Sequence, residues 1–215
     1  MTLQDLDLKY VNGVLTTSKS IHTTGSLTVG GSFTLGGVVS TSYPPVPVPS
    51  DHGLLGWSYD PSFALSTLTP TLGTVYLSAV YIRQAVTISK LWFMLGTAAT
   101  TPTSGQNWIG LVNSSGTILS TASLDSVITS GNAPKSATLS AAQAVTAGTY
   151  WVALLFNAAA APVIYKTAMP FTGFGVVNQA TASYRYATAG TSQTSLSAIT
   201  MSSNSAGQSI WVAAS

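Results

Sequence analysis

Two copies of a six-residue unit, GSLTVG and GSFTLG, stand back to back at residues 25–36. Each copy places two apolar residues two positions apart, with a threonine between them and glycine at both ends, which predicts a short strand closed by a turn. An isolated ribbon of this size is marginal in water because it has no second layer. We therefore expect several chains, most simply three, to wrap together into an oligomeric stem that buries Leu27, Val29, Phe33 and Leu35.

The chain carries very little charge. Charged residues make up 6% of its 215 residues, and the formal net charge is +2, whereas about 25% is usual in ordinary domains. A monomer with so few charges has weak colloidal protection, so we expect neighbouring subunits or a larger assembly to cover much of the surface. Lysine and arginine form no cluster, which argues against nucleic-acid binding. With no cysteine, disulfides and thiolate metal sites are excluded.

No segment has the pattern of a membrane span or a secretion signal. The longest apolar stretch, residues 151–161, is interrupted by Asn157 and is shorter than the roughly 20 residues that a bilayer requires. The first five residues, MTLQD, have neither the basic start nor the apolar core of a secretion signal. We expect no membrane insertion.

The chain falls into four segments. Residues 1–20 form a leader, residues 21–42 the glycine-punctuated β stem, residues 43–50 a proline-rich linker, and residues 51–215 a head. Four prolines in YPPVPVP fix the backbone and remove hydrogen-bond donors, so we expect the linker to be extended and semi-rigid.

The leader permits two interpretations. Apolar residues alternate with charged ones at its start and Asn12-Gly13 is a strong turn signal, which together predict a short hairpin; the spacing of Leu3, Leu6 and Tyr10 also fits a short helix. In either form the leader is suited to anchor the chain to another protein, and the candidate docking residues are Leu3, Leu6, Leu8 and Tyr10.

The head is expected to be all-β, a jelly-roll-like antiparallel β-sandwich. Short apolar runs recur between turns rich in glycine, serine, asparagine and proline, which is typical of sandwiches. Expected strands cover residues 74–82 (with an irregularity in the middle), 85–95, 108–112, 117–119, 137–139, 149–156, 163–165, 174–177, 184–187 and 209–213. Asn113–Gly116 predicts the turn of a hairpin. The one helix candidate is Ser140–Val145.

Catalytic and metal-binding patterns are absent. Histidine occurs only at His22 and His52, and no nucleophile elbow accompanies them. The head has three carboxylates, Asp51, Asp60 and Asp125, which we interpret as loop and turn residues rather than as a glycosidase pair. Asp5 and Asp7 share a face of the leader with Lys9, which favours a solvated edge over a calcium site. We expect a protein that is not an enzyme and that has no metal or cofactor.

Binding of a carbohydrate is more plausible chemistry for this chain, because aromatic faces stack on sugar rings while neighbouring polar groups supply hydrogen bonds. The candidate glycan-binding residues are Trp108 beside Gln106 and Asn107, then Tyr165, and finally Tyr184, Arg185 and Tyr186. Large aromatic residues inside strands are more often core; we expect this of Trp92, Trp151 and Trp211, and Trp108 itself is open to the same interpretation.

Two parts of the chain carry a resemblance to bacteriophage proteins. GSLTVGGSFTLGG resembles the glycine-punctuated stems of phage fibres. The runs GTVYLSAVYI, VTISKLWFMLGTA, GLVNSSGTIL and VTAGTYWVALLFN, with the closing RYATAGTSQTSLSAITMSSNSAGQSIWVA, resemble a β-sandwich module of minor tail proteins from phages that infect actinobacteria. The resemblance covers most of residues 73–215. It implies a virion surface protein, assembled in the host cytoplasm, without deciding between tail and capsid.

Three functions follow as hypotheses. The first is a non-enzymatic fibre or spike, a homotrimer docked to other virion proteins by its N-terminus, whose head contacts host-surface glycan. The second is a capsid decoration protein (a head fibre) without a receptor role of its own. The third is a free carbohydrate-binding or hydrolytic module, for which a secretion signal or a carboxylate pair would be expected.

Overall fold

The computed structural model describes residues 8–11, 14–17, 47–168, 185–197, 199, 205–206 and 209–215. The chain divides into two units, Met1–Pro45 and Val46–Ser215, so that the boundary falls inside the proline-rich segment. The predicted stem residues Leu27, Val29, Phe33 and Leu35 lie outside the described residues, as does the strand expected at 174–177. None of the helices in the described ranges is long and apolar enough to cross a membrane.

The first unit contains a β-hairpin. Strand β1 (Leu8–Val11) pairs antiparallel with β2 (Val14–Thr17), and Val11 lies opposite Val14. These strands flank the Asn12-Gly13 pair at which the sequence predicted a turn. Of the two interpretations of the leader, the structure therefore contains the hairpin. Two of the candidate docking residues, Leu8 and Tyr10, belong to β1, and the other two, Leu3 and Leu6, lie outside the described residues.

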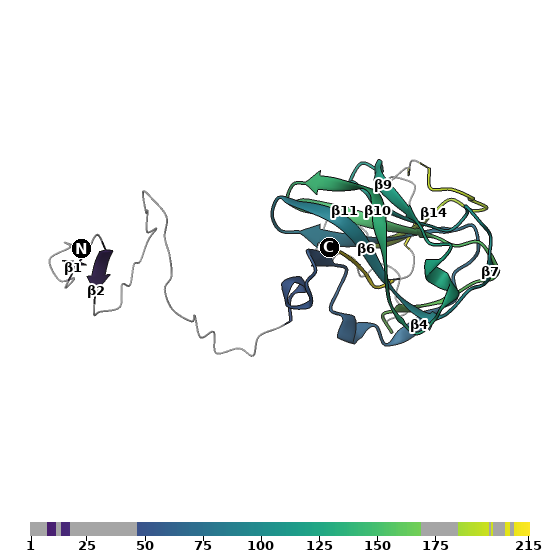
Figure 1. The fold of residues 1–215 in the computed structure, drawn as a ribbon, viewed down its shortest axis with the longest axis horizontal. Coiled ribbons are helices and arrows are strands. Elements are labelled where there is room, and N and C mark those ends of the chain that lie inside the picture. The colour runs from purple at the N-terminus through teal and green to yellow at the C-terminus, as the bar shows by residue number, and fades with distance from the viewer. Residues whose placement is uncertain are drawn as a thin grey trace. The chain divides into compact units, whose positions relative to one another are not determined.

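The second unit is all-β, as predicted, and its strands form two antiparallel six-stranded sheets, an arrangement consistent with a β-sandwich (Figure 1). In the first sheet the order is β3-β16-β6-β13-β4. Strands β16 and β13 pair with successive parts of β6, and β10 pairs with β6 along its opposite edge. These strands are β3 (Gly56–Trp57), β4 (Ser66–Leu68), β6 (Val86–Thr97), β10 (Ala133–Val145), β13 (Val163–Lys166) and β16 (Val212–Ala214).

The second sheet has the order β15-β14-β5-β11-β8-β9. Its strands are β5 (Val75–Ile82), β8 (Trp108–Val112), β9 (Ile118–Ser123), β11 (Gly148–Leu155), β14 (Tyr186–Ala189) and β15 (Ser205–Ala206). A small separate sheet pairs β7 (Thr100–Pro102) with β12 (Ala158–Ala160). The described residues also contain three short 3₁₀ helices: η2 (Pro49–His52), η3 (Pro61–Phe63) and η4 (Val127–Thr129). The extended conformation expected of the linker at residues 43–50 is wrong for Pro49 and Ser50, which belong to η2.

The main hydrophobic core lies between the two sheets. Strand β6 contributes a row of completely buried residues, Ile88, Leu91, Phe93 and Leu95. Across the interior, the Phe93 ring lies 6.1 Å from that of Phe156, with the planes tilted by 57°, a separation at which aromatic pairs attract. Burial of these side chains is the main favourable term in folding, since the head has no disulfide to constrain it.

Strand β5 is buried on both faces from Val75 to Val80. Tyr76, Val80 and Ile82 belong to the main core, whereas Val75, Leu77 and Ala79 belong to a second cluster on the opposite face. The segment 190–199 contributes Leu196 and Ile199 to that second cluster, and the Ile199 N–H donates to the Gly116 carbonyl. Double burial explains the apolar pattern of residues 74–82. The irregularity predicted there is wrong, because β5 pairs with β11 without any shift of register.

The predicted helix at Ser140–Val145 is also wrong, because these residues are part of β10. The register of β10 against β6 shifts between Thr138 and Gln143, so that extra residues bulge out of the strand. At the bulge the Ala141 N–H donates to the Ser120 hydroxyl of β9 over 3.1 Å. Sheet pairing on both sides of the bulge overrides the helix propensity of a short alanine-rich run.

The predicted hairpin at residues 108–119 is confirmed, with β8 and β9 joined around Asn113–Gly116. The Asn113 side-chain oxygen accepts hydrogen bonds from the Ser115 and Thr117 N–H groups, at 3.0 and 2.9 Å. Gly116 has a φ of +87°, a conformation that glycine adopts without steric cost. The asparagine therefore serves the turn, as the sequence suggested.

Candidate functional site

A cleft with a volume of about 470 Å³ opens beside the C-terminal end of β5. One side is formed by η2, β3 and the two residues that follow β3, and the other by the end of β5 with Arg185. Its lining residues are Val48, Pro49, Ser50, Leu54, Leu55, Trp57, Ser58, Tyr59, Tyr81, Ile82, Arg83, Gln84, Val86 and Arg185. A volume of this size lies in the range of pockets that bind small molecules or sugar units.

Aromatic side chains from both sides line the cleft, and we call them together its aromatic wall. Trp57 and Tyr59 are partly buried, and Tyr81 keeps 37% of its surface exposed. The His52 ring packs against Trp57 with its centroid 5.4 Å away. Gly56 lets β3 lie close against the end of β5, because a Cβ atom at residue 56 would lie 2.9 Å from the Tyr81 carbonyl oxygen. The result is an accessible aromatic surface of the kind on which a sugar ring stacks.

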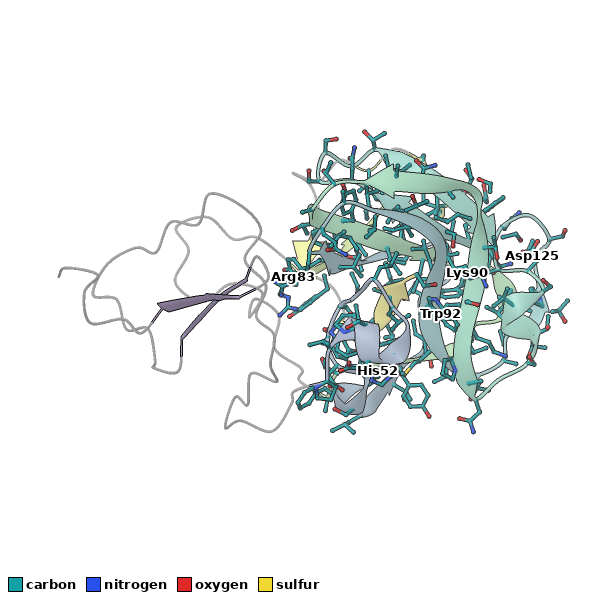
Figure 2. All side chains as sticks on the ribbon, turned by 60° about the vertical axis from the view of Figure 1, so that its left-hand side comes forward. His52, Arg83, Lys90, Trp92 and Asp125 are labelled. Carbon is teal, nitrogen blue, oxygen red and sulfur yellow. The ribbon has the colours of Figure 1, made fainter. Side chains whose placement is uncertain are left out.

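Two arginines make the cleft electropositive. Arg185 donates from Nη2 to the Ser58 carbonyl at 2.9 Å, and its guanidinium carbon lies 5.4 Å from the centre of the Tyr81 ring, a cation–π distance. Arg83 is exposed just beyond the end of β5; Figure 2 shows it on the same side of the head as His52. Among the described lining residues there is no carboxylate, so neither positive charge is neutralised inside the cleft.

Asp51 and Asp60 are next in sequence to residues that line the cleft, but both have local structural roles. Asp51 accepts a hydrogen bond from the Val48 N–H at 2.9 Å and so caps η2. Asp60 accepts one from the Ser62 N–H at 2.8 Å and caps η3. Hydrogen bonds from the Ser62 hydroxyl and N–H hold the pKa of Asp60 below its ordinary value. Within the described residues no group of three histidine, cysteine or acidic side chains is placed to hold a metal ion.

Tyr59 joins the aromatic wall of the cleft to the C-terminal segment. Its hydroxyl donates to the Ser209 carbonyl at 3.1 Å, and its own carbonyl accepts from the Trp211 indole N–H at 3.0 Å. Burial raises the pKa of the Tyr59 phenol well above its ordinary value, since a phenolate would lose its hydration there. The group is therefore a fixed hydrogen-bond donor at neutral pH.

This shift predicts a loss of stability at alkaline pH. The pKa of the Tyr59 phenol is higher in the folded chain than in the unfolded chain, where it is about 10. The stability that the neutral phenol contributes is therefore complete below about pH 10 and declines as the pH rises above that value. We expect Tyr59→Phe to reduce the slope of unfolding free energy against pH between about pH 10 and 11.5. Urea denaturation of both proteins across this range measures the slope, and identical slopes would contradict the prediction. Tyr150→Phe is the control.

The predicted glycan residues around Trp108 lie elsewhere in the head. Trp108 is partly buried, packs against the second hydrophobic cluster, and donates from Nε1 to the Gly105 carbonyl at 3.0 Å. Asn107 is completely buried, and its amide bonds the Asp125 carboxylate at 2.9 Å. Figure 2 places Asp125 at the opposite side of the head from Arg83. Since its side chain is enclosed, Asn107 has a structural role in place of the predicted ligand contact.

The remaining predicted residues are also dispersed. Tyr165 belongs to β13 in the first sheet, and Tyr186 to β14 in the second. Tyr184 lies outside the described residues. Gln106 is partly buried next to Asn107, and its carbonyl accepts from the Asn157 amide at 3.1 Å. Of the predicted glycan-binding set, Arg185 is the described member that lines the cleft.

Sequence reasoning missed the aromatic wall. Trp57 and Tyr59 come from GWSY, a run in which two aromatic residues alternate with small ones directly after a glycine. This pattern is the signal that could have drawn attention to them, because alternation places both rings on one face. They line the same cleft as Tyr81 and Arg83 because β3 lies close to β5. Local sequence does not encode that contact.

Comparison of the chain with protein-family models and with curated proteins finds no match.

Proposed function

We propose that this chain is a non-enzymatic structural protein of a bacteriophage virion, a surface fibre or spike whose β-sandwich head contacts host-surface glycan. The proposal rests on the hexad repeat at residues 25–36. Its apolar row has no partner within a single ribbon, so it requires sister chains. The low charge of the chain and the resemblance of its stem and head to phage proteins give further support.

The division of the chain into two units supports separate roles for its N-terminal hairpin and its head. The N-terminal hairpin consists of two four-residue strands, too little structure to be stable alone, which suits a segment that docks on another virion protein. The head, in contrast, has its own core between two sheets. A docked leader, an oligomeric stem and an outward head together make a spike.

The cleft supports a binding role for the head. It combines exposed aromatic surface with unneutralised arginine. A single cleft of this kind binds a sugar weakly, and three heads on one stem would raise the effective affinity through multivalency.

Light scattering after size exclusion tests the oligomeric stem. We expect the full chain to have about three times the mass of its 22.1 kDa polypeptide. The double variant Leu27→Asp, Phe33→Asp should be monomeric, because it places charge in the shared apolar row.

The matched control is Thr28→Asp, Thr34→Asp, which adds the same charge on the alternate face of the ribbon and should remain a trimer. A wild-type chain that runs as a monomer at micromolar concentration would contradict the stem and the proposed spike.

A further inference from the structure

A second, smaller hollow adjoins the cleft. It has a volume of about 120 Å³ and is lined by Ser58, Tyr59, Ser78, Thr167, Arg185 and Ser209. Ser58, Tyr59 and Arg185 line the cleft as well, so the two spaces share a wall. We call the smaller one the inner chamber. At roughly 30 Å³ per water molecule, it has room for about four waters or one small polar substituent.

Ser78 is the unusual member of the inner chamber. It is 2% exposed, and its hydroxyl has no hydrogen-bond partner. It sits in the middle of β5, where its neighbours across the sheet are Val152 on β11 and Tyr186 on β14. A buried hydroxyl without a partner costs free energy, and such groups in folded proteins call for an explanation. A bound polar group in the chamber would supply the missing partner.

Two other hydroxyls of the chamber already form hydrogen bonds. The Ser58 hydroxyl donates to the Ile210 carbonyl at 3.3 Å and accepts from the Val212 N–H at 3.1 Å. The Tyr59 hydroxyl donates to Ser209. The donors that remain include the Ser78 hydroxyl and the guanidinium N–H groups of Arg185 beyond the one bonded to Ser58. A ligand group that fits this balance accepts hydrogen bonds and carries negative charge.

We propose that the inner chamber receives the carboxylate of an acidic sugar whose ring lies on the aromatic wall of the cleft. This inference rests on the proposed glycan contact and names its substrate class. Arg185 supplies the charge-assisted hydrogen bond, Ser78 donates a second one, and Arg83 adds positive potential at the entrance. Both arginines of the chain line the cleft, whose described lining holds no carboxylate, so an acidic glycan is attracted there.

Titration with two sugars that differ only at C6 tests the proposal on the full chain. The probes are methyl β-D-glucuronide and methyl β-D-glucoside, with affinity measured by chemical-shift changes in NMR spectra. Loss of a charge-assisted hydrogen bond typically weakens binding by about tenfold or more, so we expect at least that preference for the glucuronide. Glucose 6-phosphate is the third probe, and tighter binding of it would overturn the assignment to a carboxylate.

Three variants locate the carboxylate. Arg185→Gln should remove the preference for the glucuronide, whereas Lys90→Gln, the same change of charge at an exposed position on β6, should retain it. Ser78→Ala should weaken glucuronide binding while thermal stability is unchanged or higher, because it removes a buried hydroxyl that lacks a partner. A merely structural serine would not give this combination. A preference that survives both Arg185→Gln and Ser78→Ala would overturn the chamber as its site.

The outcomes separate this inference from the proposed function. Equal binding of both methyl glycosides, lost in Trp57→Ala, would overturn the carboxylate and leave the glycan contact standing. No binding of any probe would overturn both, and the chain would then fit the capsid-decoration alternative if it is a trimer. The light-scattering result does not depend on either sugar.

Discussion

Replacing Asn107 with alanine is expected to lower the free energy of unfolding by about 2–4 kcal/mol, since it removes three hydrogen bonds that each contribute about 0.5–1.5 kcal/mol. The Asn107 amide donates to the Thr103 carbonyl and to the Asp125 carboxylate, both at 2.9 Å, and its oxygen accepts from the Asn157 N–H at 2.7 Å. Alanine would remove all three bonds at a side-chain position that is completely buried, and it would leave the Asn157 N–H without its acceptor. Urea denaturation followed by tryptophan fluorescence measures the change.

Gln106→Ala is the matched control for this prediction. Gln106 precedes Asn107 in the chain and contributes its backbone carbonyl to the same region, which alanine retains, so the expected change is within about 0.5 kcal/mol. Comparable losses of unfolding free energy in the two variants would contradict the structural role assigned to the Asn107 side chain.

Gly73→Ala is expected to destabilise the head by about 2–4 kcal/mol, as the sum of a left-handed backbone penalty and a steric clash. Gly73 has a φ of +73°, and a Cβ atom there would lie 2.9 Å from Ser192 Cα. Its carbonyl also accepts a hydrogen bond from the Gln193 N–H at 2.8 Å. The substitution therefore pushes the segment 190–199 away from the β5 face that it covers. Denaturant unfolding again gives the magnitude.

Gly105→Ala separates the two causes. Gly105 has a nearly identical φ of +72°, but no atom lies within 4 Å of the position that a Cβ would occupy. It should show the backbone penalty alone, about 1–2 kcal/mol. Equal losses at the two glycines would mean that the contact with Ser192 contributes nothing.

The strands of the head could be predicted where one face is buried and the other is wet. In β6 the buried residues Leu91, Phe93 and Leu95 alternate with partly exposed ones, and the β8–β9 hairpin is set by the local turn chemistry of Asn113 and Gly116. Both signals depend on residues close in sequence. The all-β class follows from them directly.

Where distant segments determine the structure, the sequence pattern was misleading. The run in β5 suggested an irregularity because the segment 190–199, more than a hundred residues later, buries its second face. Residues 140–145 suggested a helix because pairing with β6 is not visible locally. Asn107 suggested a ligand contact beside Trp108, yet its partners Asp125 and Asn157 are 18 and 50 residues away. The cleft was missed for the same reason.

The position of β16 has a consequence for how the head is made. Residues 212–214 lie between β3 and β6, and the Ser58 N–H donates to the Val212 carbonyl. On the ribosome, β3 emerges more than 150 residues before the strand that ties it to its sheet. We expect slow folding dominated by long-range contacts. The aromatic wall of the cleft should assemble last, after translation of residues 212–214.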